Sequence, residues 1–146
     1  MFKTLDVGSG AHPSGDVNVD LYITDEERKR AGLKARFEIP PVLVKADAHY
    51  LPFAPETFEG IICFHTLEHL LCPYTVLREM YGVLKKGGKI VIDVPNVKLI
   101  TTEHKTHYYS WSVSSLQNLI RRAGFSIVKV TPEIKSLNMQ VVGVKQ

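Results

Sequence analysis

The chain has 146 residues, of which 45% are hydrophobic and 23% are charged, a balance that is typical of a folded globular domain and excludes a disordered tail. A formal net charge of +3 is too small to indicate nucleic acid or a membrane surface as a partner. No stretch approaches the ~20 apolar residues of a membrane-spanning helix, and the first ten residues lack the basic region and apolar run of a secretory signal, so we expect a cytoplasmic protein.

Short apolar runs, rich in β-branched residues, predict the strands. In chain order these runs are 4–7, 17–19, 42–44, 61–64, 90–94, 126–130 and 139–144. Helical patterns lie between several of them and cover 24–35, 73–86 and 112–124. The ends of these patterns carry suitable residues, since Ser112 is a good N-cap and Gly87 and Gly124 suit left-handed helix ends.

No internal repeat, low-complexity run or linker divides the chain, so we expect residues 1–146 to form a single domain. Strands that alternate with helices favour a parallel sheet with crossover connections. The last two strands, joined by residues 131–138, have no helix between them and predict an antiparallel hairpin at the sheet edge. The expected fold is α/β: a doubly wound, Rossmann-like mixed sheet of about seven strands, in the order 3-2-1-4-5-7-6.

A glycine-containing loop follows the first predicted strand, in the run Leu5-Asp6-Val7-Gly8-Ser9-Gly10. In open α/β sheets, ligands bind at the carboxyl ends of the strands, where glycine permits a close approach of the backbone. The dinucleotide fingerprint needs a third glycine three residues after the second, and Pro13 stands there, so hydride transfer is disfavoured. The plainer alternative is that Gly8 and Gly10 only form a turn.

Acidic residues follow the next two predicted strands. Asp20 ends the second strand, where a carboxylate can accept both hydroxyl hydrogens of a ribose diol. Asp47 follows the third strand, where it can accept from an exocyclic amine such as that of adenine. Alternatively, Asp20 only caps the helix that begins after Thr24. The basic run 28–36 either holds phosphates of an acceptor or, more simply, forms a solvated helix face.

Four segments resemble the successive motifs of class I S-adenosylmethionine-dependent methyltransferases of the small type 11-like kind: LDVGSG, NVDL, ADAHYLPFAPETFEGIICFHTLEHL and LREMYGVLKKGGKIVIDVPN. The resemblance covers nearly the whole chain. It implies an enzyme that transfers a methyl group from S-adenosylmethionine to an acceptor, a small molecule or a larger one, that the sequence does not identify. The residues that it places around the cofactor are Asp6, Gly8, Ser9, Gly10, Asp20, Leu21, Asp47, Ala48, Phe64 and His65.

The chain departs from this family at two places. Only residues 11–16 separate the glycine loop from the second strand, too few for the helix that family members have there, and the first strand follows Met1 without the usual lid helices. An open cofactor site is wetter than usual. The alternative function is therefore a catalytically inactive methyltransferase-like binding or assembly module, and we expect either a homodimer or a partner subunit to cover the exposed face.

Histidines are the best candidates for a catalytic base. Methyl transfer requires the protein to position two reactants and to manage one proton, and imidazole titrates near neutral pH. Family members carry a histidine before a Ser-capped helix, which His104 or His107 matches. His12 and His65 also lie near this edge, and we favour His104 or His107 over His12; the plainer alternative is that each histidine caps backbone or faces solvent.

The run His65-Thr66-Leu67-Glu68-His69 also fits an inverted zinc-protease pattern, with Cys63 and Cys72 nearby. That protease signature needs one long helix that carries both histidines. Here the run begins at a strand end and meets Pro73 four residues after its last histidine, so such a helix is not expected. We therefore expect no metal site in this run.

Overall fold

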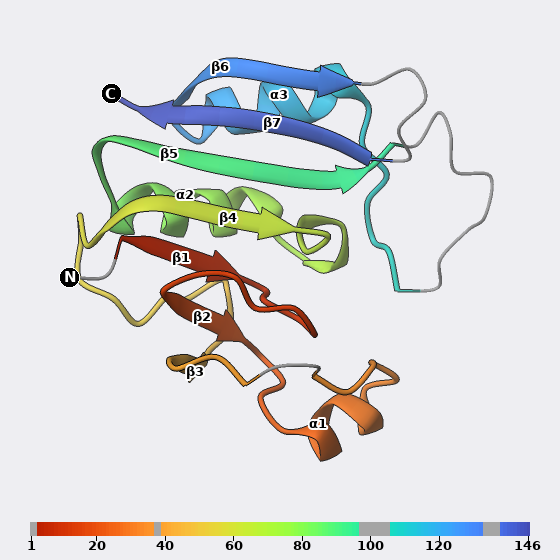
Figure 1. The fold of residues 1–146 in the computed structure, drawn as a ribbon. Helices are drawn as coiled ribbons and strands as arrows, with labels where there is room; N and C mark the ends of the chain where they lie inside the picture. Colours follow the sequence, from red (N-terminus) through yellow and green to blue (C-terminus); the bar gives the residue numbers. More distant parts are fainter. Residues whose placement is uncertain (1–2, 37–38, 97–105, 133–137) are drawn as a thin grey trace.

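The predicted strands form one seven-stranded sheet (Figure 1) in the computed structural model, which describes residues 3–36, 39–96, 106–132 and 138–146. The strands are β1 (Thr4–Val7), β2 (Val17–Asp20), β3 (Leu43–Lys45), β4 (Phe58–Phe64), β5 (Leu84–Pro95), β6 (Phe125–Pro132) and β7 (Asn138–Lys145). Their order is β3-β2-β1-β4-β5-β7-β6, with β7 antiparallel to both of its neighbours and the other pairs parallel. The predicted mixed sheet, its strand order and its C-terminal antiparallel hairpin are confirmed.

The helices of the described ranges are α1 (Asp25–Arg30), the 3-10 helix η1 (Leu67–His69), α2 (Pro73–Val83) and α3 (Val113–Arg122). Ser112 caps α3 as predicted, since its hydroxyl accepts from the Ser115 amide at 3.1 Å. Pro73 stands in the first turn of α2. Backbone amides of the first turn make no hydrogen bond within the helix, so the missing amide hydrogen of proline costs nothing there. None of these helices is long and apolar enough to cross a lipid bilayer.

α1 is shorter than the predicted helix over 24–35, because a glycine ends it. Gly32 has a left-handed φ of +74°, and beyond it the Leu33 amide donates to the Arg28 carbonyl at 2.8 Å. This closure satisfies one of the last carbonyls of the helix and turns the chain away. The predicted start of the helix was right, and its predicted end was wrong.

α2 also ends before residue 86, where its predicted end lies. Leu84 is fully buried and pairs with Phe58 of β4, so the chain gains sheet pairing there in place of a further helical turn. Residues 85–88 then form a bulge in β5 before regular pairing resumes. Gly87, predicted to end the helix, instead lies in this bulge with a φ of +75°.

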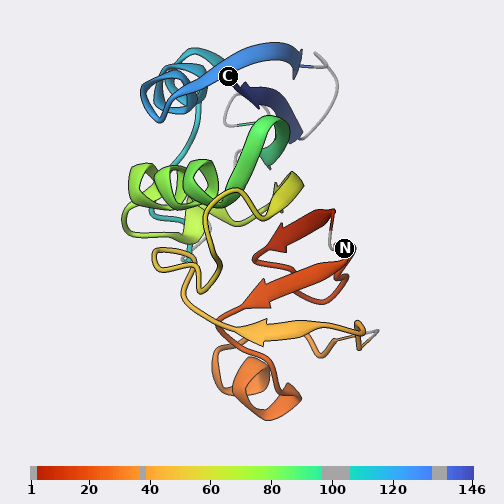
Figure 2. The ribbon, with the colours of Figure 1, turned by 90° about the vertical axis from the view of Figure 1, so that its left-hand side faces the viewer.

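The two faces of the sheet are covered differently (Figure 2). α2 and α3 lie on one face, where the strand residues that point toward them are fully buried. On the opposite face, Ile62, Val91 and Val142 stand in one row across β4, β5 and β7 and are only half-buried. No helix of the described ranges covers this row, which agrees with the short 11–16 connection between β1 and β2.

Candidate functional site

The glycine loop lies at the carboxyl end of β1, between the ends of β2 and β4 (Figure 1). The amides of Gly8 and Ser9 both donate to the Val19 carbonyl, at 2.8 and 3.1 Å, so the loop is held against β2. Gly8 has a φ of +72°, and a Cβ at this position would overlap the Thr66 side chain just after β4. Glycine therefore permits a contact between two loops that are 58 residues apart in the chain.

Two buried polar side chains beside this loop differ in their bonding. The Asp6 carboxylate accepts from the Ser14 amide at 3.0 Å and the Ser14 hydroxyl at 3.3 Å, and burial raises its pKa. These bonds fix the 11–16 connection against β1. The buried Ser9 hydroxyl, by contrast, has no hydrogen-bond partner among the described residues, so it is available to a ligand.

Asp20 ends β2 beside the glycine loop, as predicted. Its carboxylate accepts from the amides of Gly10 and Tyr22, at 2.9 and 3.0 Å. The Arg28 guanidinium donates to it at 3.2 Å, and the Arg36 guanidinium lies 3.8 Å away. A carboxylate has about four acceptor positions, so these bonds leave roughly one for a ribose hydroxyl rather than two. The contact of Asp20 with a ribose stays a prediction, and the carboxylate has room for about one ribose hydroxyl.

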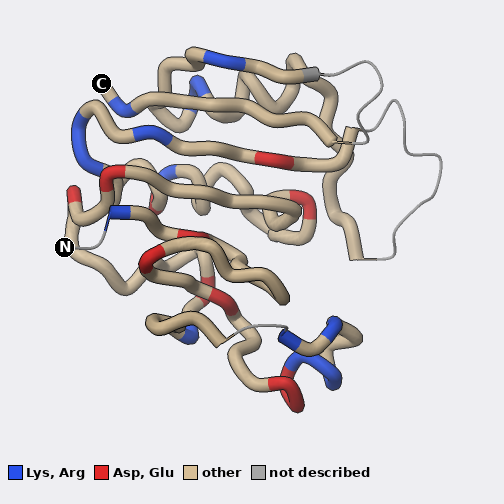
Figure 3. Tube along the Cα trace, viewed as in Figure 1, with Lys and Arg blue, Asp and Glu red and all other residues tan. Residues whose placement is uncertain are grey.

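Both arginines come from the α1 segment (residues 25–36), whose acidic residues come first and whose basic residues follow (Figure 3). The side chains of Arg28 and Arg36 are 4% and 3% exposed, so the interpretation of the basic run as a solvated helix face is wrong for these two residues. Arg36 also donates to the carbonyls of Gly10 and Tyr22. The α1 segment is therefore fastened to the glycine loop through buried cations, which sequence reasoning missed.

The predicted adenine side of the site combines a carboxylate with exposed apolar side chains. Asp47 accepts from the His49 amide at 2.9 Å, and this bond is the main cause of its lowered pKa, so the carboxylate is ionised at neutral pH. The adjacent Ala48 is buried. Leu21 and Phe64, which follow and end β2 and β4 respectively, are 48% and 40% exposed and offer an apolar surface to a heteroaromatic ring.

A buried carboxylate faces several histidines after the end of β4. Glu68 in η1 is 1% exposed, and neither of its carboxylate oxygens accepts a hydrogen bond from the described residues. His65 has a left-handed φ of +48°, its Nδ1 lies 3.7 Å from Glu68 Oε1, and its Nε2 lies 3.4 Å from Asp93 Oδ1. The interaction with Glu68 is the main cause of the raised pKa of His65. The contact of His65 with a cofactor stays a prediction.

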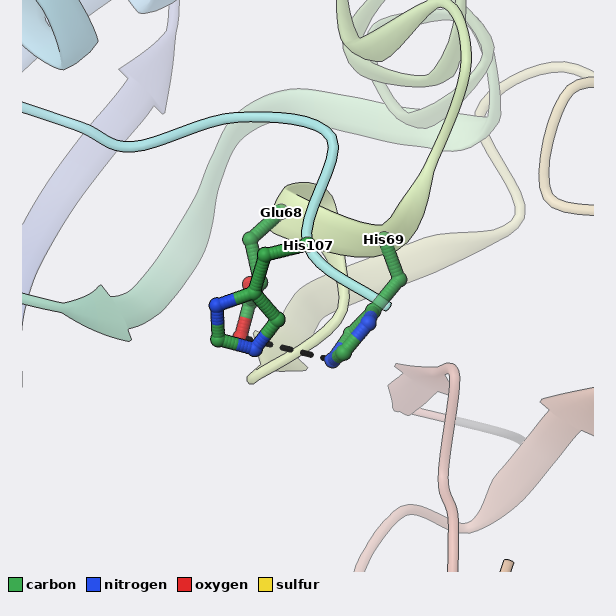
Figure 4. A group of neighbouring side chains, drawn as sticks. All are labelled: Glu68, His69 and His107. Atoms are coloured by element: carbon green, nitrogen blue, oxygen red, sulfur yellow. Dashed lines mark ion pairs between the residues drawn. The ribbon is translucent and has the colours of Figure 1, made fainter. Parts of the chain in front are cut away.

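His69 and His107 approach the same carboxylate (Figure 4). His69 Nε2 lies 3.8 Å from Glu68 Oε1, and the rings of His69 and His107 make an edge contact with their centroids 4.6 Å apart. The structure thus brings one of the two predicted bases, His107, to the end of β4; its role stays a prediction, and His104 lies outside the described residues. Sequence reasoning missed this cluster because only folding brings His107 to Glu68.

Known proteins share this arrangement of strands and motifs. A family model described as a methyltransferase domain matches residues 5–92. The O-methyltransferase cnsE of Penicillium expansum is 33% identical over 94 residues, which cover 59% of this chain and 34% of that enzyme. The chain spans only 34% to 37% of the length of the first three curated relatives that it matches.

Solved structures share the fold over nearly the whole chain. A SAM-dependent methyltransferase of Thermotoga maritima matches with a TM-score of 0.73 at 19% identity, over 100% of this chain and 83% of that one. The partner of the Trm112 methyltransferase activator, in a complex from Haloferax volcanii, matches with a TM-score of 0.69 at 14% identity, over 98% of this chain and 81% of that one. At these identities the likeness concerns the fold.

Proposed function

Because the chain belongs to the methyltransferase domain family, we propose that it is an S-adenosylmethionine-dependent methyltransferase that binds its cofactor at the carboxyl ends of β1, β2 and β4. The observation that carries this proposal is the Ser9 hydroxyl, which is buried at the end of β1 and has no hydrogen-bond partner among the described residues. A buried hydroxyl in this state is unfavourable unless a ligand bonds to it.

The residues at this edge fit the cofactor. We assign the glycine loop and Asp6 to its methionine end, Asp20 and Leu21 to the ribose and adenine, and the pair Asp47 and Ala48 with Phe64 to the adenine edge. The fit rests on the orphaned Ser9 hydroxyl and on the exposed apolar side chains at the ends of β2 and β4. S-adenosylmethionine supplies an electrophilic methyl group. The chain therefore has to bind the cofactor and the acceptor, orient them toward each other and manage one proton.

We place the methyl acceptor at the end of β4, next to the histidines around Glu68. The imidazoles of His65 and His107 lie there, and imidazole accepts a proton near neutral pH. The acceptor is a nucleophile that carries a removable proton, whether a small molecule or part of a larger one.

Thermal unfolding with and without S-adenosylhomocysteine tests the cofactor site. At about 100 times its Kd, this ligand should add about 2.7 kcal/mol to the free energy of unfolding, or roughly 5–10 °C to the Tm. Ser9→Ala should leave the Tm of the free protein unchanged or higher, and weaken binding about fivefold through the loss of one hydrogen bond. Val128→Ala, at an exposed position of the edge strand β6, is the matched control and should leave binding unchanged.

A second candidate function is a methyltransferase-like module without catalytic activity, and the bonding of Asp20 favours it. The carboxylate expected to hold the ribose already accepts from two backbone amides and a buried guanidinium. A Tm that does not change at any concentration of S-adenosylhomocysteine supports this second candidate and contradicts the methyltransferase.

We also propose that a second copy of the chain covers the half-buried row of Ile62, Val91 and Val142, because exposed apolar patches commonly mark protein interfaces. Light scattering should give the mass of a dimer, and Val91→Lys should give that of a monomer. A monomeric mass for the parent chain contradicts the dimer and directs the search to an activator-like subunit, as in the Haloferax volcanii complex.

The free thiols of Cys63 and Cys72 suit the reducing cytoplasm, where we place the protein.

A further inference from the structure

We propose that Glu68, His69 and His107 form a binding site for a divalent transition-metal ion, with zinc as the ion of best chemical fit. Each residue offers one ligand atom, and these atoms all lie within 4.8 Å of one another (Figure 4). Two imidazole nitrogens and one carboxylate oxygen are a donor set of catalytic zinc sites. The set differs from the protease pattern in the sequence, because it uses His107 and because η1 is a single short turn.

Glu68 is the side chain that most requires an ion. Its side chain is 1% exposed, and both carboxylate oxygens are buried without a hydrogen bond from the described residues. A buried carboxylate is strongly unfavourable unless it is paired and hydrogen-bonded. The nearest ring nitrogens of His65 and His69, at 3.7 and 3.8 Å, lie beyond hydrogen-bond distance. A metal ion at this carboxylate supplies a positive charge at bonding distance.

The hydrogen bond of His69 fixes which of its nitrogens faces the carboxylate. His69 Nδ1 lies 2.9 Å from the Thr106 carbonyl oxygen, which can only accept, so Nδ1 carries the hydrogen. In the neutral ring, Nε2 then has a lone pair and lies 3.8 Å from Glu68 Oε1. Metal-bound histidines commonly have their other nitrogen held in this way by a backbone carbonyl. The ring is therefore prepared to bind a cation through Nε2.

Backbone contacts hold the third ligand in place. The Tyr108 amide donates to the Glu68 carbonyl at 2.8 Å, and the Tyr109 hydroxyl donates to the Leu71 carbonyl at 2.8 Å. Together with the bond between Thr106 and His69, these contacts fasten residues 106–109 to residues 68–71. The ligands are positioned before any ion binds, which lowers the entropic cost of binding.

An ion would draw together the three ligand atoms, which lie within 4.8 Å of one another. With metal–ligand distances of ~2.0–2.2 Å, tetrahedral coordination places two ligand atoms ~3.4 Å apart. The corresponding atoms of His69 and Glu68 are 3.8 Å apart, and a small rotation of either side chain closes the difference. Three protein ligands leave at least one coordination position open, which is typical of catalytic rather than structural zinc.

The role of the ion rests on the methyltransferase proposed above. The open position would bind an oxygen or nitrogen atom of the acceptor, and a cation lowers the pKa of a hydroxyl group or water bound to it. The acceptor would then lose its proton to water more readily, and its lone pair would attack the methyl carbon as the carbon–sulfur bond breaks, which leaves S-adenosylhomocysteine. In this arrangement His107 is a ligand, and not the catalytic base predicted from the sequence.

A zinc titration of the full chain tests the site in the absence of any cofactor. After removal of metals with a chelator, calorimetry with zinc chloride should show a single site per chain. Glu68→Gln, which removes the charge and keeps the shape, and His107→Ala should each weaken zinc binding at least about tenfold. His49→Ala is the matched control, because this half-buried histidine contacts Asp47 and lies outside the cluster, and it should bind zinc as the parent does.

Cobalt(II) provides a second measurement. The parent chain should show visible absorption bands of coordinated cobalt that disappear in His107→Ala, and circular dichroism should show that both variants remain folded. If one variant does not fold, the other decides. No zinc binding by the parent, or zinc binding by Glu68→Gln and His107→Ala that is as tight as the parent's, would overturn the metal site. Neither result affects the methyltransferase proposal, because its own test is the response to S-adenosylhomocysteine.

Discussion

Two buried carboxylates stand at the same edge of the sheet and have opposite surroundings. Asp20 accepts from two backbone amides and from the Arg28 guanidinium, with Arg36 close by. Glu68 accepts no hydrogen bond from the described residues and is approached by imidazoles. The chain thus supplies a permanent countercharge at one position and leaves room for an external one at the other. The protein itself satisfies most of the acceptor positions of Asp20, whereas both carboxylate oxygens of Glu68 are open to a ligand.

The largest effect is expected from the removal of the countercharge at Asp20. Arg28→Met keeps the apolar stem and leaves the buried carboxylate without its nearest cation, so it should lower the free energy of unfolding by about 3–5 kcal/mol. Urea unfolding measures this loss. Arg30→Met, on the same helix and exposed beside Glu26, should cost at most about 1 kcal/mol. Equal losses for the two variants would mean that Arg28 does not hold the charge of Asp20.

The glycine loop packs between Asp20 and the end of β4. Disturbing this packing should give the second-largest loss of stability. Gly8→Ala should cost about 2–4 kcal/mol, since it adds a left-handed backbone penalty to an overlap with Thr66. Gly10→Ala has a similar φ of +58°, but its Cβ would meet only the Gly8 carbonyl oxygen at 3.8 Å, so it should cost about 1–2 kcal/mol. Chemical denaturation compares the two, and equal costs would argue against the contact with Thr66.

A gain in stability is expected at Glu68. In the presence of a chelator, Glu68→Gln should raise the free energy of unfolding by about 1–3 kcal/mol, because it replaces a buried carboxylate that accepts no hydrogen bond from the described residues with a neutral amide. Glu79→Gln is the control, since Glu79 accepts from the Leu51 amide at 2.8 Å and should gain nothing. A loss of stability in Glu68→Gln would show that the surrounding histidines already balance the charge.

The smallest effect concerns the helix that carries Arg28. Thr24 caps α1 by accepting from the Glu27 amide at 3.1 Å, so Thr24→Ala should cost about 1 kcal/mol. Thr24→Ser keeps the hydroxyl and should cost much less. Thermal unfolding of both variants is sufficient, and a loss in Thr24→Ser as large as that in Thr24→Ala would exclude the cap as the cause.

Local patterns in the sequence predicted the strands, their order and the cap at Ser112, because each depends on neighbouring residues or on general rules of connection. The end of α1 was predicted wrongly, although Gly32, inside the predicted helix, is a residue that often ends one and has a positive φ here. The position of Asp20 beside the glycine loop followed from the geometry of parallel strands.

The partners of the carboxylates were not readable in the same way. Arg28 and Arg36 belong to a basic run that resembles any solvated helix face, and their burial depends on how the α1 segment folds back on the glycine loop. The meeting of Glu68 and His107 depends on a backbone bond from Tyr108, across a long stretch of chain. Such pairs have no periodicity or spacing that a single sequence reveals.

The Thr66 side chain fills the space that a Cβ on residue 8 would need, and it fits there because residue 8 is glycine. In a family of related sequences these two positions should therefore change together. A chain with alanine at position 8 has room only for a smaller residue at position 66, so we expect a change at position 8 to require one at position 66. The glycine loop is thus linked to a residue that follows the central strand β4, and a loop transplanted between relatives should function only when its partner position moves with it.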